Sequence, residues 1–474
     1  MYTPFPEEIW QEIFDHLVLI LGPSYKGLRV ALKLRLICSF FARGIIRAIH
    51  STQIFREEKL YYYAPESLSS DYLRFQVLRR GQSSNDLINV IRIAARTLRL
   101  SNKTPLCDGS ENLYNYTTIL SEALVKVIPT WEVLRMMLLN NHSPIQHTID
   151  PPDSPRHLIS AAACVGNTEL VKSLLQTEGI SCNYVSSFFG APLHLAALNG
   201  HVDTLKLLLE AGADPNLVNW ISWEYKWEED DIRIYTVTPL NFACLSGKWE
   251  IIRILSLPEY NIPVTDIHYQ YAILNAVKGG HSDIVSYLLD KADLSSVPET
   301  TVYQFWYRTL RVACAHGSID VVKVLLNRGV SVHKISGSRV LEPPLSITAG
   351  LGYYEIMTIL LEKGADPNRR SLIRDTVPLL SCSFTKAAKY GFVKSFQMLM
   401  DYTKQTRHHK EVIHYAARSG QEHVIRYLAV TGIWSSLCGG KDKEVAEEAV
   451  KYASDQGYPW VGSLLAELGL LEPQ

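Results

Sequence analysis

Neither sign of charge dominates this sequence of 474 residues, because 47 Lys and Arg residues stand against 48 Asp and Glu residues. A balanced charge gives no overall attraction for nucleic acid or for an anionic membrane surface. The 8 cysteines are scattered, with no C-x-x-C pair and no histidine cluster at zinc-ligand spacing. We therefore expect a cytoplasmic and/or nuclear protein with no metal or other cofactor and no direct contact with nucleic acid.

Long hydrophobic runs are also missing near the N-terminus. The first twelve residues contain Glu7, Glu8 and Glu12 and no basic stretch that leads into an apolar core, so we expect no secretory signal. The longest early apolar stretch, residues 17–21, is far too short to span a bilayer. No membrane partner is expected.

What the sequence does have is an internal repeat, marked by a recurring glycine. The intervals are close to 33 residues, about the period of a helical repeat, and are longer where loops are inserted. The series is Gly166, Gly200, Gly247, Gly280, Gly317, Gly352, Gly391, Gly420 and Gly457.

Each glycine of the series has similar neighbours in the sequence. Small residues such as Ala196 and Ala197 stand three and four positions before it, where they allow close helix contact. Apolar pairs such as Leu208 and Leu209 stand eight and nine positions after it, and with Leu205 they lie on one helical face. The pattern predicts two antiparallel helices joined by a turn at the glycine.

Two further signatures flank the predicted helix pair. Residues 191–196 read A-P-L-H-L-A and residues 238–243 read T-P-L-N-F-A, with proline at the first helical position. Residues 212–216 and 364–368 both read G-A-D-P-N, a glycine cap followed by turn formers. With these signatures, the chain resembles the ankyrin-repeat proteins.

The resemblance implies an all-α fold, an ankyrin-repeat solenoid of about nine or ten copies that binds another protein. We expect the array at residues 119–468, behind a helical connector at residues 56–118 and an N-terminal helical domain at residues 1–55. The copies are expected near 119–150, 155–183, 190–216, 238–264, 268–294, 306–333, 342–368, 378–403, 410–434 and 443–468.

The N-terminal domain has a different pattern. Residues 5–14 read F-P-E-E-I-W-Q-E-I-F and start a helix with Ile9, Ile13 and Leu17 on one face, and residues 34–41 read L-R-L-I-C-S-F-F. This segment resembles an F-box, and F-box followed by ankyrin copies is an arrangement found in fungal proteins. The resemblance implies docking to a Skp-type adaptor, and thereby to a cullin complex, through Phe5, Pro6, Ile9, Ile13, Leu36, Ile37 and Phe41. The alternative is a helical cap on the first repeat.

Two of the insertions in the array are rich in aromatic residues. The first spans residues 217–237 and the second spans residues 295–307, and both are expected to be loops on the binding side. Tryptophan and tyrosine are typical anchors of protein interfaces, although rings that cover neighbouring turns are an equally good interpretation. The candidate target-binding residues are Trp220, Trp223, Tyr225, Trp227, Tyr303 and Trp306.

No group of residues in the sequence forms a recognisable catalytic constellation. His194 and His414 occupy one repeat position, which predicts structural hydrogen bonds, and Cys164, Cys244 and Cys314 occupy small helix positions that predict inert packing. No phosphate-binding loop or dinucleotide fingerprint is present. We therefore expect no enzyme but a recognition protein: a substrate-recognition adaptor of an SCF-type ubiquitin ligase, or alternatively an ankyrin scaffold or transcriptional coregulator.

Overall fold

The structure is a computed structural model in which most of the chain can be described. None of the helices in these described parts is long and apolar enough to cross a bilayer. The described residues are 7–21, 45, 48–49, 66–79, 83–101, 109–128, 133, 136–137, 150–220, 225–227, 230–232, 236–260, 266–292, 299–333, 342–369, 382–403 and 410–472.

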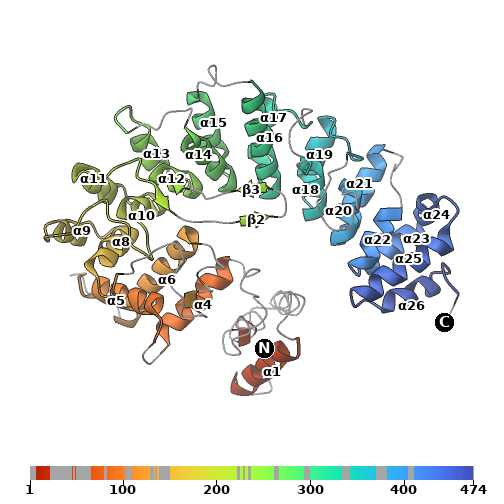
Figure 1. The fold of residues 1–474 in the computed structure, drawn as a ribbon, viewed down its shortest axis with the longest axis horizontal. Coiled ribbons are helices and arrows are strands. Elements are labelled where there is room, and N and C mark those ends of the chain that lie inside the picture. Colours follow the sequence, from red (N-terminus) through yellow and green to blue (C-terminus); the bar gives the residue numbers. More distant parts are fainter. Residues whose placement is uncertain are drawn as a thin grey trace. The chain divides into compact units, whose positions relative to one another are not determined.

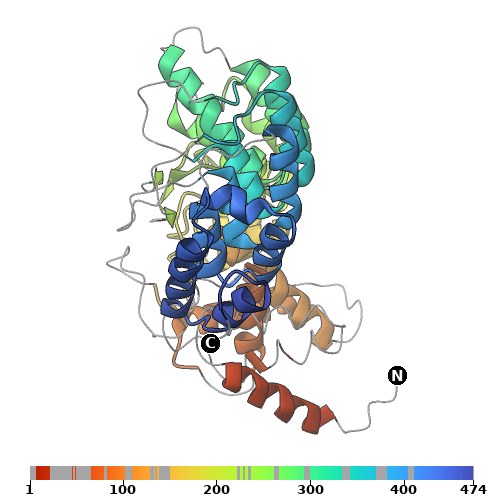
Figure 2. The same ribbon diagram turned by 90° about the vertical axis from the view of Figure 1, so that its right-hand side faces the viewer.

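The chain forms two compact units. Unit 1 contains residues 1–224 and 233–262, and unit 2 contains residues 225–232 and 263–474. Figures 1 and 2 show that helices follow one another in pairs along each unit. The helices of unit 1 are α1 (Glu7–Leu21), α4 (Glu66–Leu78), α5 (Asp86–Ser101), α6 (Gly109–Val127), α8 (Pro155–Val165), α9 (Thr168–Leu175), α10 (Pro192–Asn199), α11 (Val202–Glu210), α12 (Pro239–Ser246) and α13 (Trp249–Leu255).

Unit 2 continues the same pattern with longer helices in some pairs. Its last pair is preceded by a short extra helix, α24. The helices are α14 (Ile267–Lys278), α15 (Ser282–Lys291), α16 (Glu299–Ala315), α17 (Ile319–Asn327), α18 (Pro344–Leu351), α19 (Tyr354–Glu362), α20 (Ser383–Tyr390), α21 (Val393–Thr403), α22 (Lys410–Arg418), α23 (Glu422–Val430), α24 (Ile433–Cys438), α25 (Asp442–Asp455) and α26 (Trp460–Glu467).

Within each unit the helices pack in two layers. The first helix of a pair contacts the first helix of the next pair, as α8 contacts α10 and α10 contacts α12 in unit 1. In unit 2 the first-helix layer runs through α14, α16, α18, α20, α22 and α25, and the second helices α15, α17, α19, α21 and α23 form the other layer. Small buried residues such as Ala196 and Ala197 permit this close packing.

The residues predicted to form a connector between the N-terminal domain and the array are helical where the structure describes them. Helices α4, α5 and α6 pack on one another, and α5 and α6 both contact α8 of the first complete pair. The Asn85 side chain, buried beside the start of α5, donates a hydrogen bond of 2.8 Å to the Met136 carbonyl. Helices α5 and α6 therefore pack directly against the first pair.

The glycine between paired helices has two structural requirements, which Gly352 illustrates. Its φ of +74° is in the left-handed region that other residues adopt at a cost. A Cβ atom added at Gly352 would also lie 2.6 Å from Cε1 of Phe392, the residue that follows the glycine of the next pair. Glycine is therefore required at this position both for the turn and for the close contact with the neighbouring pair.

Replacing Gly352 with Ala should therefore destabilise unit 2 more than replacing Gly364, the glycine that ends α19. Gly364 has φ +84° but nothing within 4 Å of an added Cβ, so it reports the backbone cost alone. We expect about 1–2 kcal/mol for Gly364→Ala and at least about 1 kcal/mol more for Gly352→Ala. Urea unfolding of the two variants measures the difference, and equal losses would show that the Phe392 contact is unimportant.

The insertion at residues 217–237 contains the strands of the described chain. In unit 1, β1 (Asn219–Trp220) pairs antiparallel with β4 (Thr236–Val237). In unit 2, β2 (Tyr225–Trp227) pairs antiparallel with β3 (Asp230–Ile232). The Trp, Tyr, Ile and Val residues of this insertion favour such strand pairing.

Candidate binding surface

A recurring hydrogen bond ties one helix pair to the next. The donor stands six residues before the glycine of its own copy, and the acceptor is the carbonyl ten residues before the glycine of the next copy. The three bonds join Ser160 Oγ to the Gly190 carbonyl at 2.8 Å, His194 Nε2 to the Val237 carbonyl at 3.0 Å, and Arg311 Nε to the Glu342 carbonyl at 2.7 Å.

This position explains the two histidines that the sequence singled out. His194 is buried and donates to the next copy, and His414 Nε2 lies 3.0 Å from Glu448 Oε2 on α25. The interpretation of His194 as a structural hydrogen-bonding residue agrees with this geometry. Ser160 and Arg311 were missed because their residue types differ, although counting back six positions from each glycine would have found them.

Burial lowers the pKa of His194 to about 4. The folded protein therefore holds this imidazole neutral under conditions in which the unfolded chain, with an ordinary histidine pKa, takes up a proton. The hydrogen bond to Val237 raises the pKa but does not overcome the burial. His194 links the stability of its copy to pH.

Stability should fall as the pH drops from about 6.5 to 4 and change little through His194 below that range. Between pH 7.5 and pH 5 this histidine alone contributes a loss of about 2 kcal/mol. His194→Asn, which places there the residue found at Asn241 in the next copy, should flatten this dependence. Urea unfolding at both pH values measures it, with the exposed His423→Asn as control. An unchanged pH slope in His194→Asn would contradict the assignment.

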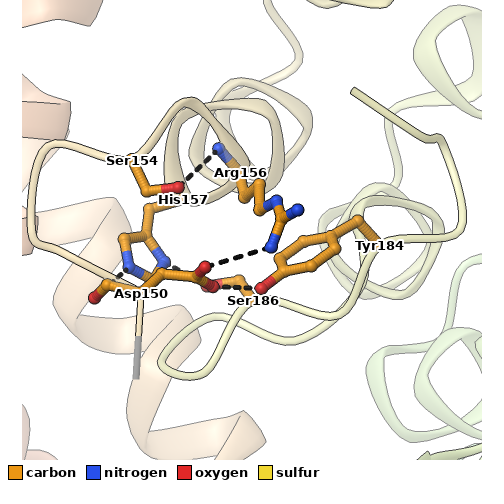
Figure 3. A network of polar contacts seen from close by, with 6 residues as sticks. All are labelled: Asp150, Ser154, Arg156, His157, Tyr184 and Ser186. Atoms are coloured by element: carbon orange, nitrogen blue, oxygen red, sulfur yellow. Dashed lines mark hydrogen bonds and ion pairs between the residues drawn. The ribbon is translucent and has the colours of Figure 1, made fainter. Parts of the chain in front are cut away.

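A polar network lies at the entry to α8 and joins residues far apart in sequence (Figure 3). Asp150 accepts hydrogen bonds from the Arg156 guanidinium, at 3.2 Å, and from the Tyr184 hydroxyl. The Arg156 guanidinium lies over the Tyr184 ring, 4.3 Å from its centroid. Beside them, His157 Nδ1 and Ser186 Oγ are 2.8 Å apart.

The network fixes the turn of the next copy against the start of α8. The carboxylate of Asp150 and the guanidinium of Arg156 form an ion pair. Burial lowers the pKa of His157, which favours the neutral imidazole. Desolvation raises the pKa of the Tyr184 hydroxyl. These groups are joined to protein partners, which favours a structural role over catalysis.

The buried cysteines are equally unsuited to chemistry. Burial raises the pKa of the Cys164 thiol to about 12, and burial also raises the pKa values of Cys244 and Cys314. A nucleophilic cysteine needs a lowered pKa and access to solvent. The thiols agree with the interpretation as inert packing.

The second aromatic insertion is a helix where the structure describes it. Helix α16 begins at Glu299 and includes Tyr303 and Trp306, so the expected loop at residues 295–307 is wrong from residue 299 onward. The apolar period continues into the insertion, with Phe305, Leu310 and Ala313 buried. Tyr303 is half-buried and its hydroxyl donates to the His333 carbonyl, and Trp306 is half-buried beside Phe305.

The residues predicted from the first insertion are only partly within the described chain. Trp220 lies in β1, and Tyr225 and Trp227 lie in β2, where the structure gives their backbone. Trp223 lies outside the described residues. Their role in target binding stays a prediction.

Only some of the predicted adaptor-binding residues lie within the described chain. Ile9 and Ile13 both lie in α1, and Ile13 is 43% exposed while Phe14 and Val18 are buried. The adaptor interpretation requires an apolar side chain at the surface of α1, and Ile13 is such a side chain. Phe5, Pro6, Leu36, Ile37 and Phe41 lie outside the described residues.

Large apolar side chains are exposed along the first-helix layer of unit 2. Leu351 at the end of α18 is 44% exposed, Tyr390 at the end of α20 is 40% exposed, and Tyr452 on α25 is 39% exposed. The Tyr390 ring approaches Gly350, where an added Cβ would lie 3.2 Å from Cδ2 of the ring. Exposed aromatic rings held by their neighbours are suitable anchors for a protein partner.

Comparisons with known proteins agree with this architecture. Residues 131–219 and 240–336 match the family model described as Ankyrin repeats (3 copies). The chain is 28% identical over 302 residues to the ankyrin repeat and KH domain-containing protein mask-1 of Caenorhabditis elegans, covering 53% of this chain and 10% of that protein. It is 35% identical over 115 residues to the probable E3 ubiquitin-protein ligase XBOS33 of Oryza sativa, covering 24% of this chain and 19% of that protein.

Among solved structures, the chain is similar to the ankyrin repeat domain of human ASB11. The two are 28% identical, with a TM-score of 0.38, over 52% of this chain and 96% of that domain. The helix pairs and the family match together define an all-α ankyrin-repeat solenoid, which confirms the fold predicted from the sequence. Ankyrin repeats typically mediate protein–protein interaction.

Proposed function

We propose that the chain is a substrate-recognition adaptor of an SCF-type ubiquitin ligase. In this role α1 and the residues after it hold a Skp-type adaptor, and the ankyrin copies hold the target, without catalysis by this chain. The observation that carries the proposal is the exposed Ile13 on α1, in a segment that reads as an F-box. Single exposed apolar side chains are common on protein surfaces, so Ile13 supports the proposal because it lies in this F-box-like segment.

The name of one relative supports a role in a ubiquitin ligase. XBOS33, which matches part of this chain, is described as a probable E3 ubiquitin-protein ligase. The match covers about a fifth of that protein and about a quarter of this chain. The link to ubiquitin transfer through a Skp-type adaptor rests on the N-terminal segment of this chain.

Coexpression of the full chain with a Skp-type adaptor and a cullin tests the proposal. We expect the three proteins to copurify and to elute together from a sizing column. An ankyrin scaffold or transcriptional coregulator predicts a different result, in which no adaptor is recovered and a transcription factor copurifies instead. Failure to recover the adaptor under coexpression would contradict the ubiquitin-ligase role and leave target binding by the repeats intact.

A further inference from the structure

The polar network at the start of α8 fits only the neutral form of His157. The Ser186 hydroxyl oxygen accepts hydrogen bonds from the backbone N–H groups of Phe188, at 3.3 Å, and of Phe189, at 3.1 Å. Because a serine oxygen has two lone pairs, these bonds use both, and the hydroxyl donates its hydrogen to His157 Nδ1, 2.8 Å away. This ring nitrogen is therefore an acceptor, as it is only in a neutral imidazole.

The second ring nitrogen agrees with this assignment. In a neutral imidazole whose Nδ1 accepts, Nε2 carries the hydrogen, and His157 Nε2 lies 3.4 Å from the Asp150 carbonyl oxygen. Protonation would add a hydrogen to Nδ1, which would then face the hydroxyl hydrogen of Ser186. That hydroxyl would have to rotate and give up one of the backbone hydrogen bonds that it accepts.

These backbone bonds belong to a turn of the next copy, at residues 182–190. The His157 ring packs beside the Phe188 ring, with centroids 5.4 Å apart, and both Phe188 and Phe189 are buried. Ser160, further along α8, donates a hydrogen bond of 2.8 Å to the carbonyl at the end of the turn, and this bond involves no titratable group. Protonation of His157 would therefore loosen the middle of the turn while its end stays attached.

The surroundings of the ring disfavour its charged form. Helix α8 packs against α5, α6, α9 and α10, and among the described residues the Asp150 carboxylate is the charged group that acts on the His157 ring. Burial lowers the pKa of His157, and the hydrogen bond to Asp150 and its charge raise the pKa without overcoming the burial. The carboxylate already accepts from Arg156 and from the Tyr184 hydroxyl, so an imidazolium would have to share it.

Two further histidines join the same copy to its neighbours. His194 on α10 donates to the next copy, and His201 before α11 has its Nε2 3.0 Å from a carbonyl at the end of α8. Burial lowers the pKa of both rings, with the charge of Asp214 opposing this at His194 and the charge of Lys248 adding to it at His201. Acid therefore weakens several contacts of this copy, and the network at α8 is the one that holds a turn.

We propose that the network of Asp150, Arg156, His157, Tyr184 and Ser186 is a proton-sensitive clasp, in which neutral His157 keeps the turn at residues 182–190 closed on α8 and protonated His157 releases it. Release exposes Phe188 and Phe189, and exposed aromatic rings are typical anchors of protein interfaces. Recognition by this part of the array would then depend on pH. The inference goes beyond the function proposed above, and its test needs neither an adaptor nor a target.

Hydrogen exchange of the full-length chain at pH 7.5 and pH 5.0 tests the clasp. The closed turn is favoured above about pH 6.5 and loses this advantage as the pH falls below that value, because the folded chain takes up the proton less readily than a free histidine does. After correction for the intrinsic pH dependence of exchange, protection of the Phe188 and Phe189 amides should fall about tenfold or more. Helices α18 and α19, which contain no histidine, should lose much less.

A substitution at the titrating position separates the clasp from general acid unfolding. His157→Asn keeps an acceptor near the position of Nδ1 and takes up no proton in this range, so protection of the turn should no longer depend on pH. The exposed His423→Asn is the matched control and should behave like wild type. Full protection of the Phe188 and Phe189 amides at pH 5.0 in wild type, a fall that persists in His157→Asn, or an equal fall in α18 and α19 would each overturn the proposal.

The wild-type ring itself gives a second readout, which holds even if His157→Asn does not fold. Nitrogen chemical shifts of 15N-labelled histidine, assigned through the backbone, report which ring nitrogen carries the hydrogen. At pH 7.5 the His157 ring should be neutral with its hydrogen on Nε2, and Ser186→Ala should move its titration to higher pH, because the neutral form loses a hydrogen-bond donor. A hydrogen on Nδ1 at pH 7.5, or a titration that Ser186→Ala leaves unchanged, would contradict the clasp.

Discussion

Replacing Ala197 with Glu is expected to unfold several neighbouring copies of unit 1. Ala197 is fully buried on α10, which packs between α8 and α12. A carboxylate forced into this contact has no partner, and such burial costs about 3 kcal/mol or more. Because each copy depends on its neighbours, hydrogen exchange should rise most in α8, α10 and α12.

The matched control lies in the same copy. Ala211, just after α11, is exposed, so Ala211→Glu introduces the same charge without burying it. The free energy of unfolding of Ala211→Glu, measured by thermal melting, should stay within about 0.5 kcal/mol of that of the wild type. If Ala197→Glu melted like Ala211→Glu, the assigned contact between first helices would be wrong.

Replacing Ile13 with Asp is expected to abolish copurification of the Skp-type adaptor. Ile13 is exposed on α1, so the charge should leave the helix folded while placing a carboxylate in the proposed interface. Loss of one well-packed anchor commonly costs about 2 kcal/mol, or about thirtyfold in affinity. Quantitative pull-down from coexpressing cells measures the loss.

Two further variants serve as controls for this result. Ile13→Leu keeps an apolar side chain and should retain the adaptor. Phe14→Asp changes the neighbouring buried residue and should melt early, as a core change does. Adaptor recovery by Ile13→Asp at the wild-type level would place the docking surface elsewhere and argue for the cap interpretation of the N-terminus.

The repeat itself could be predicted from the sequence because the same local residue pattern occurs in several copies. A glycine with positive φ recurs throughout the series. Small residues before it and apolar residues after it recur in most pairs, so the pattern is recognisable even where one copy departs from it. The proline at the start of α10 and α12 and the capping box of Thr238 with Asn241 follow from the same local rules.

The contacts between copies were harder to foresee. Arg311 and Ser160 perform the same task as His194 with different donor groups, so residue identity alone concealed them. The hydrogen bond between Asp150 and Tyr184 joins residues 34 positions apart in the sequence. Only the packing of neighbouring copies brings these two residues together. Helix α16 differed from the expected loop because its apolar period continues beyond the usual start of the repeat.

The central claim, recognition of a protein target by the first-helix layer, is tested most directly by comparing two surface variants of the full chain in cells. One replaces the exposed first-helix residues Leu351, Tyr390 and Tyr452 with Ser, and the other replaces the exposed second-helix residues Tyr402 and Val430 with Ser. Affinity purification with quantitative mass spectrometry should show target proteins lost from the first variant by about tenfold or more and retained by the second. Retention of the same proteins by both variants, or loss from the second-helix variant alone, would contradict the account.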